Sequence, residues 1–355
     1  MRLKVVGKTG ERDSNFELFR IVLMLLIVAH HYVVNSGISQ LYDFNHITGN
    51  MIFLQLFGFA GKIGINCFVF ITGYFMIKSQ FKFRKLLKLY LEIKFYRWVL
   101  YMLFVISGYE TFSVMGMIKP IFNIAYDVGA GFIGTFVFLY MLIPFINTML
   151  LNLNQRLHLI LIGILIFLYT IISTFLLYDT YSNLGWMITT YTIAAYVRLY
   201  PCRWFEKKNL YVWSTIISVV LSWMSILVVD FVGSKVGFTN YYYMVANEHK
   251  FLAFVSSFSL FMLFKNIKIK QNRVINTIAA STFGVLLIHA NSDAMRRFLW
   301  QDVLHNKSYY NSPFLVVHAI LSVILVYIVC ICIDQVRIHM LEKPLFRYIE
   351  QRKNK

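Results

Sequence analysis

The sequence predicts an all-α, polytopic integral membrane protein with about ten transmembrane helices and both termini in the cytoplasm. Three observations predict this fold. Hydrophobic residues make up 59% of the 355-residue chain and charged residues only 14%, whereas an average soluble domain is about one quarter charged. Apolar segments long enough to cross a bilayer recur along the chain. The density of lysine and arginine alternates from one connecting segment to the next.

The apolar segments set the expected positions of the helices, because a helix needs about 20 residues to cross the hydrocarbon core. The first segment, 17–37, has no small-residue cleavage site after it and further spans follow, so we expect a retained helix rather than a signal peptide. The segment 51–59 is short and contains glycine, so we expect an interfacial or re-entrant piece there. The expected spans are residues 17–37, 60–78, 91–108, 133–151, 157–178, 186–198, 211–232, 251–266, 277–293 and 313–333.

The charge pattern predicts the orientation, because lysine and arginine concentrate in cytoplasmic loops. Of the 34 lysine and arginine residues, 27 fall in alternate connecting segments and the two ends, which places both termini in the cytoplasm. The net charge of +18 is then spread along the inner leaflet, and no nucleic-acid-binding face is needed to explain it. The basic segments are residues 1–20, 78–97, 152–158, 198–208, 265–273 and 334–355.

The chain contains no linker, repeat or low-complexity run, so we expect one domain over residues 1–355. The four cysteines show no metal-ligand spacing, and we expect neither a disulfide framework nor a bound metal.

The first span carries ionisable residues on one face. Arg20 and His31 are eleven positions apart, close to three helical turns, so they share a face about 16 Å apart along the axis. His30 points about 100° away from His31. Ionisable groups in a span mostly face the bundle interior or a watery cavity. We expect Arg20 to bind a phosphate near the cytoplasmic boundary and His31 to act as a base beyond the midplane.

A structural alternative exists for each of these residues. Arg20 could extend to the inner headgroups, and the histidines could hydrogen-bond neighbouring helices. No aspartate or glutamate lies clearly inside a span to pair with His31, since Asp127 and Asp230 fall near outer boundaries. Lys62, near the outer end of the second span, is a further unusual charge.

An arginine, ten intervening residues and a histidine in the first span resemble the signature of the membrane-bound acyltransferase 3 family. Further segments resemble that family in the same order. They are residues 66–75 ("F-S-G-Y" stretch), 82–90 ("R-x-x-R" loop), 139–147 ("L-Y-x-x-x-P-F-x-N") and 334–344 (closing segment), and residues 281–289 with Leu299 and Trp300, which are similar to the subgroup that O-acetylates capsule and cell-wall polysaccharide.

Two departures from the family pattern matter. Lys85 and Lys88 stand at the two arginine positions of the "R-x-x-R" segment, so point charges replace bidentate grips on phosphate. We expect no extracytoplasmic serine-hydrolase domain of the kind that some members carry, because only about twenty residues follow the last expected span. We therefore expect the membrane domain to complete the transfer itself or to pass the group to a partner.

The resemblance implies an O-acyltransferase of the bacterial plasma membrane. It would move an acetyl group from cytosolic acetyl-coenzyme A (acetyl-CoA) to a hydroxyl of a cell-surface or exported polysaccharide, or of its lipid-linked precursor. His31 and Arg20 are the expected catalytic residues. The bilayer, the donor and the glycan are the expected partners, together with a second copy or a polysaccharide synthase. No nucleic acid or metal is expected.

The remaining site residues follow from charge and position. Basic residues of the cytoplasmic loop would attract the phosphates of the donor: Arg84, Lys85 and Lys88, with Arg20 at the mouth of the bundle. Hydrogen-bonding and aromatic residues could contact the acceptor: Tyr74, Tyr140, His289, Arg296, Arg297 and Trp300. His289 could instead support His31, and the arginines with Trp300 could form an interfacial amphipathic turn.

Two chemical routes and one rival function stay open at this point, beside a third interpretation of the chain as a non-catalytic assembly partner of a polysaccharide synthase. His31 could deprotonate the acceptor hydroxyl or carry the acyl group covalently. The candidate donors to the oxyanion are Asn66, Thr72, Tyr74 and Tyr140. The rival function is a transporter or flippase for a lipid-linked sugar, in which the same charges line a path without covalent chemistry.

Overall fold

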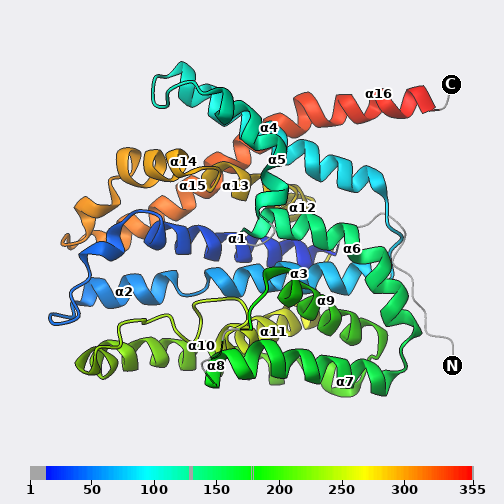
Figure 1. The fold of residues 1–355 in the computed structure, drawn as a ribbon, viewed down its shortest axis with the longest axis horizontal. Coiled ribbons are helices and arrows are strands. Elements are labelled where there is room, and N and C mark those ends of the chain that lie inside the picture. The colour runs from blue at the N-terminus through cyan, green and yellow to red at the C-terminus, as the bar shows by residue number, and fades with distance from the viewer. Residues whose placement is uncertain (1–12, 128–130, 177, 179, 354–355) are drawn as a thin grey trace.

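The computed structural model describes residues 13–127, 131–176, 178 and 180–353 (Figure 1). Within these residues the chain is 79% helical and contains no strand, so the predicted all-α, polytopic membrane fold is confirmed. The helices are α1 (Ser14–Val34), α2 (Gly49–Gly58), α3 (Gly61–Met76), α4 (Phe83–Ile106), α5 (Val114–Asp127), α6 (Phe132–Asn152), α7 (Gln155–Ile166), α8 (Ser173–Phe175), α9 (Asn183–Leu199), α10 (Lys208–Phe231), α11 (Phe251–Asn266), α12 (Arg273–Ala280), α13 (Thr282–His289), α14 (Asp293–Arg297), α15 (Leu315–Arg337) and α16 (Lys343–Lys353).

Short 3-10 and π-helical segments join or extend these helices. The 3-10 segments are Ile38–Leu41, Arg203–Glu206, Gly233–Val236 and Asn306–Tyr309. The π-helical segments are Phe167–Ile172, Phe298–Val303 and Ile338–Glu342.

Each of the ten expected spans falls largely on a helix. By length and apolar composition, six helical segments of the described chain could cross a membrane: Ser14–Val34, Gly49–Met76, Phe132–Asn152, Gln155–Phe175, Lys208–Phe231 and Leu315–Ile349. A seventh is added if Arg273–His289 and Asp293–Val303, bent by 97° at their junction, form one broken span. The helix α11 is apolar but shorter.

The prediction of an interfacial or re-entrant piece at residues 51–59 is wrong. This segment forms α2, which runs on into α3 as one apolar helical segment of 28 residues, Gly49–Met76. Only Phe59 and Ala60 interrupt the regular helix, and the glycines on either side of them allow close packing on α1. A Cβ atom on Gly58 would lie 2.9 Å from the Val33 side chain, and one on Gly61 only 2.3 Å from the His30 ring.

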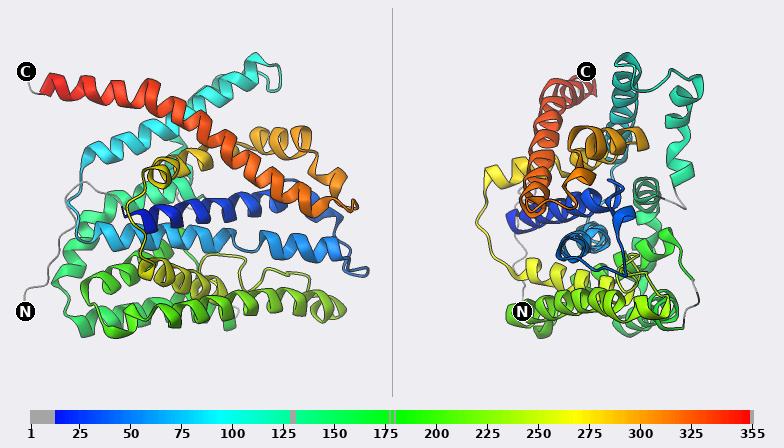
Figure 2. Two further views of the ribbon diagram at one scale, coloured as in Figure 1. Left: turned by 180° about the vertical axis from the view of Figure 1, so that it is seen from behind. Right: turned by 90° about the vertical axis from the view of Figure 1, so that its left-hand side faces the viewer.

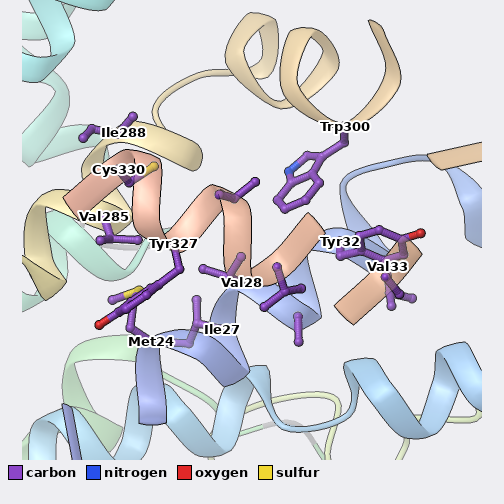
Figure 3. Close-up of a cluster of buried hydrophobic side chains, with 14 of the residues drawn as sticks. Met24, Ile27, Val28, Tyr32, Val33, Val285, Ile288, Trp300, Tyr327 and Cys330 are labelled. Carbon is purple, nitrogen blue, oxygen red and sulfur yellow. The ribbon is translucent and has the colours of Figure 1, made fainter. Parts of the chain in front are cut away.

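Helix α1 lies in the middle of the bundle. It packs against α3 and α11 on one side and against α13 and α15 on the other (Figure 2). Figure 3 shows one of the two apolar contacts of α1, in which Met24, Val28 and Tyr32 meet Val285 of α13 and Tyr327 of α15. Protein therefore surrounds α1, and its polar residues face other helices rather than lipid.

The two ends of the bundle differ in what they present. The first turn of α1 and the far end of α16 lie toward the same end in Figure 1, which is the arrangement that a common side for both termini requires. The short connection between α3 and α4 lies at this end as well. We call it the inner end, after the predicted cytoplasmic orientation, and the opposite end the outer end.

The close contact at Gly61 predicts a stability effect. Gly61→Ala should lower the free energy of unfolding by about 1–3 kcal/mol, because the new methyl group would collide with His30 and overpack the α1–α3 contact. Thermal unfolding of the detergent-purified protein measures this change.

Gly163→Ala is the matched control. Gly163 lies inside α7 with no atom within 4 Å of the position of an added Cβ, so alanine there should leave the unfolding transition unchanged or raise it. Equal effects of the two substitutions would contradict the close-packing role of Gly61.

Candidate functional site

A cavity of about 660 Å³ lies between α1, α3, α4, the start of α6 and the broken helix α13. Helix α1 contributes Arg20, Met24, Ile27 and His31, which recur every three or four residues and so form one stripe. The structure therefore brings Arg20 and His31 to the same cavity.

The other walls extend this cavity between the two ends of the bundle. Helix α3 contributes a parallel stripe from Lys62 at the outer end to Thr72 near the inner end. The first turns of α4 line the inner part, and the residues around the break after α13 line the outer part. The remaining lining residues are Ile65, Phe68, Lys85, Lys88, Leu89, Glu92, Arg97, Gly131, Phe132, Ile133, Phe136, Thr282, Phe283, Leu286, Ala290 and Arg296.

The cavity wall is strongly cationic. Among the described residues it carries six arginines and lysines and a single carboxylate, Glu92. Carboxylates that do not line the cavity hold four of these cations from behind. The pairs are Arg20–Glu17 at 2.5 Å, Lys62–Glu248 at 3.0 Å, Lys88–Glu342 at 2.5 Å and Arg296–Asp293 at 2.7 Å. The pairing lowers the cost of these charges in the bundle, while the cavity surface stays attractive to an anion.

Arg20 keeps donors for a ligand. One N–H of its guanidinium donates to the buried carboxylate of Glu17, and the side chain is 30% exposed. A guanidinium has five N–H donors. The residue is therefore fixed at the inner end of the α1 stripe and can still bind a phosphate there.

The hydrogen bonds of His31 fix which ring nitrogen carries its proton. The Nδ1 atom of His31 lies 2.9 Å from Nε2 of His289, and Nδ1 of His289 lies 2.6 Å from the carbonyl oxygen of Val285. A carbonyl only accepts, so the Nδ1 of His289 is the donor. The Nε2 of neutral His289 then accepts from Nδ1–H of His31, which leaves the lone pair of His31 on Nε2.

The lone pair on Nε2 is the chemically useful one. This atom has no hydrogen-bond partner among the described residues, and His31 lines the cavity. It can accept a proton from a ligand or attack an electrophile. His289 is fully buried and supports His31, so the structure favours this role over direct binding of an acceptor.

The adjacent histidine has a structural role. Nδ1 of His30 bonds the carbonyl oxygen of Gly58 at 2.6 Å, and its ring packs on Gly61. His30 does not line the cavity. The pair thus divides as the helical spacing indicates, with His31 on the face of Arg20.

The break after α13 brings His289 next to His31. Helix α13 ends at His289, and the chain turns by 97° before α14. The carbonyl group of Asn291, in this break, accepts a hydrogen bond from the guanidinium of Arg97 on α4. Irregular backbone inside a membrane bundle is tolerated where it lines a cavity or is buried in protein.

A second hollow, the inner cleft, adjoins the cavity at the inner end. It has a volume of about 310 Å³, and Lys85 and Lys88 line both spaces. Its other lining residues are Arg84, Glu342, Lys343, Phe346 and Arg347. The prediction of a basic loop at residues 82–90 is wrong, because α4 begins at Phe83 and these cations lie on a helix.

One buried arginine joins the inner cleft to the cavity. Arg337 of α15 contacts Asp334 at 2.8 Å, Glu342 at 2.9 Å and Glu92 at 3.0 Å, and Tyr96 donates to the same Asp334 carboxylate. This network fixes α4 on α15. Sequence reasoning missed Glu92 and Arg97, although Lys85, Lys88 and Glu92 recur at helical spacing and so share one face.

Four predicted acceptor residues lie away from the cavity. Trp300 is fully buried and packs edge-on against Tyr32 at 6.0 Å, so it is a core residue. Tyr74 accepts a hydrogen bond from Arg198, Tyr140 is buried near Phe81, and Arg297 donates to Tyr109. Of the acceptor set, only Arg296 lines the cavity.

The other candidates are also separated by their contacts. Asn66 donates to the backbone of Glu248 and accepts from Trp186, so both ends of its amide are occupied. Asp230 accepts a hydrogen bond from Gln55 at 3.0 Å and does not line the cavity, so it is not a partner of His31. The side chain of Asp127 lies outside the described residues. Lys62 and Thr72 line the cavity.

Comparison with known proteins gives one finding. A family model described as an acyltransferase domain matches residues 13–334, which include every residue of the cavity. No curated protein and no solved structure matches the chain.

Proposed function

We propose, from the premise that this chain belongs to the membrane-bound acyltransferase 3 family, that it transfers an acetyl group from cytosolic acetyl-CoA to a carbohydrate hydroxyl. The acceptor in this proposal is a cell-surface or exported polysaccharide or its lipid-linked precursor, and the location is a bacterial plasma membrane. Family membership establishes a membrane acyltransferase, so it does not favour the rival interpretation as a transporter without covalent chemistry.

One observation carries the proposal. A single cavity is lined by the guanidinium-bearing Arg20 at its inner end and by an imidazole with an available lone pair about 16 Å further along α1. Acetyl-CoA has a matching layout, because its charged nucleotide and its thioester lie at opposite ends of a long arm. Its phosphates would bind Arg20, Lys85 and Lys88, and the arm would follow the apolar residues Met24 and Ile27.

The transfer step needs one proton to move twice. Nε2 of His31 takes the proton of the acceptor hydroxyl as its oxygen attacks the thioester carbonyl carbon. The carbon–sulfur bond breaks, and the leaving thiolate takes the proton back from Nε2. The hydrogen-bond chain behind His31 ends on the Val285 carbonyl, which cannot hold a proton, so the proton returns through the cavity.

The same chain supports direct transfer over an acyl-histidine intermediate. If the acyl group were attached to Nε2 of His31, that nitrogen could no longer accept a proton. The remaining imidazole, His289, has one nitrogen bonded to Val285 and the other to His31. No imidazole at this point would then deprotonate the acceptor.

Lys62 is placed to stabilise the oxyanion. Its neighbour Gly61 contacts His30, so Lys62 lies level with His31 along the antiparallel pair α1 and α3. Thr72 is ten residues further along α3, about 15 Å toward the inner end. An ammonium group that lines the cavity beside the reacting carbonyl would stabilise the negative charge that develops in the transition state.

The experiment that tests the proposal measures release of free coenzyme A from acetyl-CoA by the purified protein in the presence of a glycan acceptor. His31→Ala should lower this rate by about 100-fold or more, because a positioned base contributes 10²–10⁴-fold. Insertion and folding should be retained. His46→Ala, at a histidine that is 85% exposed, is the control and should be indistinguishable from wild type. A wild-type rate in His31→Ala would remove His31 from the reaction.

Arg20 should act on binding of the donor. We expect Arg20→Gln to raise the KM for acetyl-CoA by about tenfold, which corresponds to the loss of one charge-assisted contact, with a smaller change in kcat. Arg20→Lys keeps the charge opposite Glu17 and should restore part of the affinity. The exposed Arg156 supplies a control, Arg156→Gln. An unchanged KM in Arg20→Gln would count against this role.

A further inference from the structure

Helix α16 lies outside the residues that the family model matches. The family model ends at residue 334, whereas α16 spans Lys343–Lys353. It continues α15 as one helical segment, Leu315–Ile349, of 35 residues, visible as the long diagonal helix of Figure 2. At 1.5 Å per residue this segment is about 52 Å long, longer than the hydrocarbon core of about 30 Å. Because α16 carries Lys343, Arg347, Arg352 and Lys353, we place it beyond the hydrocarbon core at the inner end.

Helix α16 forms one wall of the inner cleft. It contributes Lys343, Phe346 and Arg347, opposite the cations of α4. Three contacts fix it in place. Glu342, just before α16, pairs with Lys88 at 2.5 Å and with Arg337 at 2.9 Å. The guanidinium of Arg84 lies 4.8 Å from the centre of the Phe346 ring.

The charge of the cleft indicates a polyanionic ligand. Five of its seven lining residues are lysine or arginine, and its one carboxylate, Glu342, is already shared by two cations. Like charges gathered in one hollow repel each other, and a ligand with several phosphate oxygens would relieve this repulsion.

The position of the cleft orders the phosphates of the donor. Lys85 and Lys88 line both the cavity and the cleft, so the diphosphate next to the pantetheine arm would lie at these two residues. The ribose and its 3′-phosphate lie beyond the diphosphate in coenzyme A. This phosphate would then reach the residues of the cleft that lie farthest from the cavity, Lys343 and Arg347 on α16.

We propose that the inner cleft binds the 3′-phosphate of the acyl donor, and that Lys343 and Arg347 of α16 make the enzyme select a 3′-phosphorylated donor. This inference rests on the proposed function, because it assumes a coenzyme A thioester in the cavity. An anionic lipid headgroup offers the same phosphate chemistry, so the experiment must separate the two sources.

The test compares acetyl-CoA with acetyl-dephospho-CoA, which lacks only the 3′-phosphate, using the full chain in discs of purely zwitterionic lipid. Wild type should have a kcat/KM at least about tenfold higher for acetyl-CoA. Arg347→Gln should remove most of this preference by lowering kcat/KM for acetyl-CoA, with acetyl-dephospho-CoA unchanged. Lys343→Gln should act in the same direction. Lys82→Gln, at an exposed lysine just before α4 that does not line the cleft, should keep the preference.

A binding measurement keeps the inference independent of turnover. Calorimetric titration with 3′,5′-ADP and with 5′-AMP, which lacks only the 3′-phosphate, should give tighter binding of the former to wild type, and equal binding of the two to Arg347→Gln. If wild type releases no coenzyme A but still shows this difference, the proposed function fails and the cleft assignment stands.

Three outcomes would overturn the inference. Wild type could use both donors equally, or Arg347→Gln could slow both donors to the same extent. Arg347→Gln could also leave donor preference intact in zwitterionic discs and lower activity only when phosphatidylglycerol is added, which would identify a lipid headgroup as the ligand.

Discussion

The structure depends on one constraint: charged groups inside an apolar bundle must face water or a partner. Helix α1 carries Arg20 and His31 on one stripe and is enclosed by protein on both sides. The surrounding helices therefore cannot pack tightly onto that stripe, and a cavity follows it between the two ends of the bundle. Helix α3 turns a matching stripe, with Lys62 at its outer end, toward the same space. In the proposed reaction this cavity is the route along which donor and acceptor meet.

The polar network around the cavity explains why so many charges are tolerated there. Four of the cations are each paired with a carboxylate that does not line the cavity, which lowers the cost of keeping their charges inside the bundle. At the inner end, Arg337 joins three carboxylates and so connects Glu92, which lines the cavity, to Glu342, which lines the inner cleft. At the outer end, the helix breaks after His289, and His289 forms a hydrogen bond with His31. Both devices connect segments far apart in the sequence.

The sequence predicts features that depend on the spacing of residues along one helix, but not contacts between helices that are distant in the sequence. The eleven-residue spacing of Arg20 and His31 requires one helical face, and the structure has both on one cavity. Helical spacing alone does not pair His31 with His289, 258 positions away, and the sequence offered this support only as one of two roles for His289. Glu92 was missed because the expected span began only at residue 91, which left Lys85 and Lys88, on the same face of α4, in an expected loop. Trp300 was assigned to an acceptor surface, since an aromatic ring beside Arg296 and Arg297 suits stacking on a sugar, and the alternative was an aromatic belt. The bend after α13 and the π-helical segment that follows bury it against Tyr32 instead.

The central claim is that Arg20 and His31 share one water-filled space that the donor enters from the inner side. Labelling of a cysteine at Thr72, on the facing wall of α3, tests this most directly. The exposed Cys202 and Cys332 would first be replaced by serine, and the buried Cys67 on another face of α3 serves as an internal control. A charged, membrane-impermeant thiol reagent should modify Thr72→Cys from the inner side, coenzyme A should block the reaction, and Cys67 should stay unmodified. A Thr72→Cys residue that reacts only with lipid-soluble reagents, or that coenzyme A does not protect, would contradict a shared aqueous cavity.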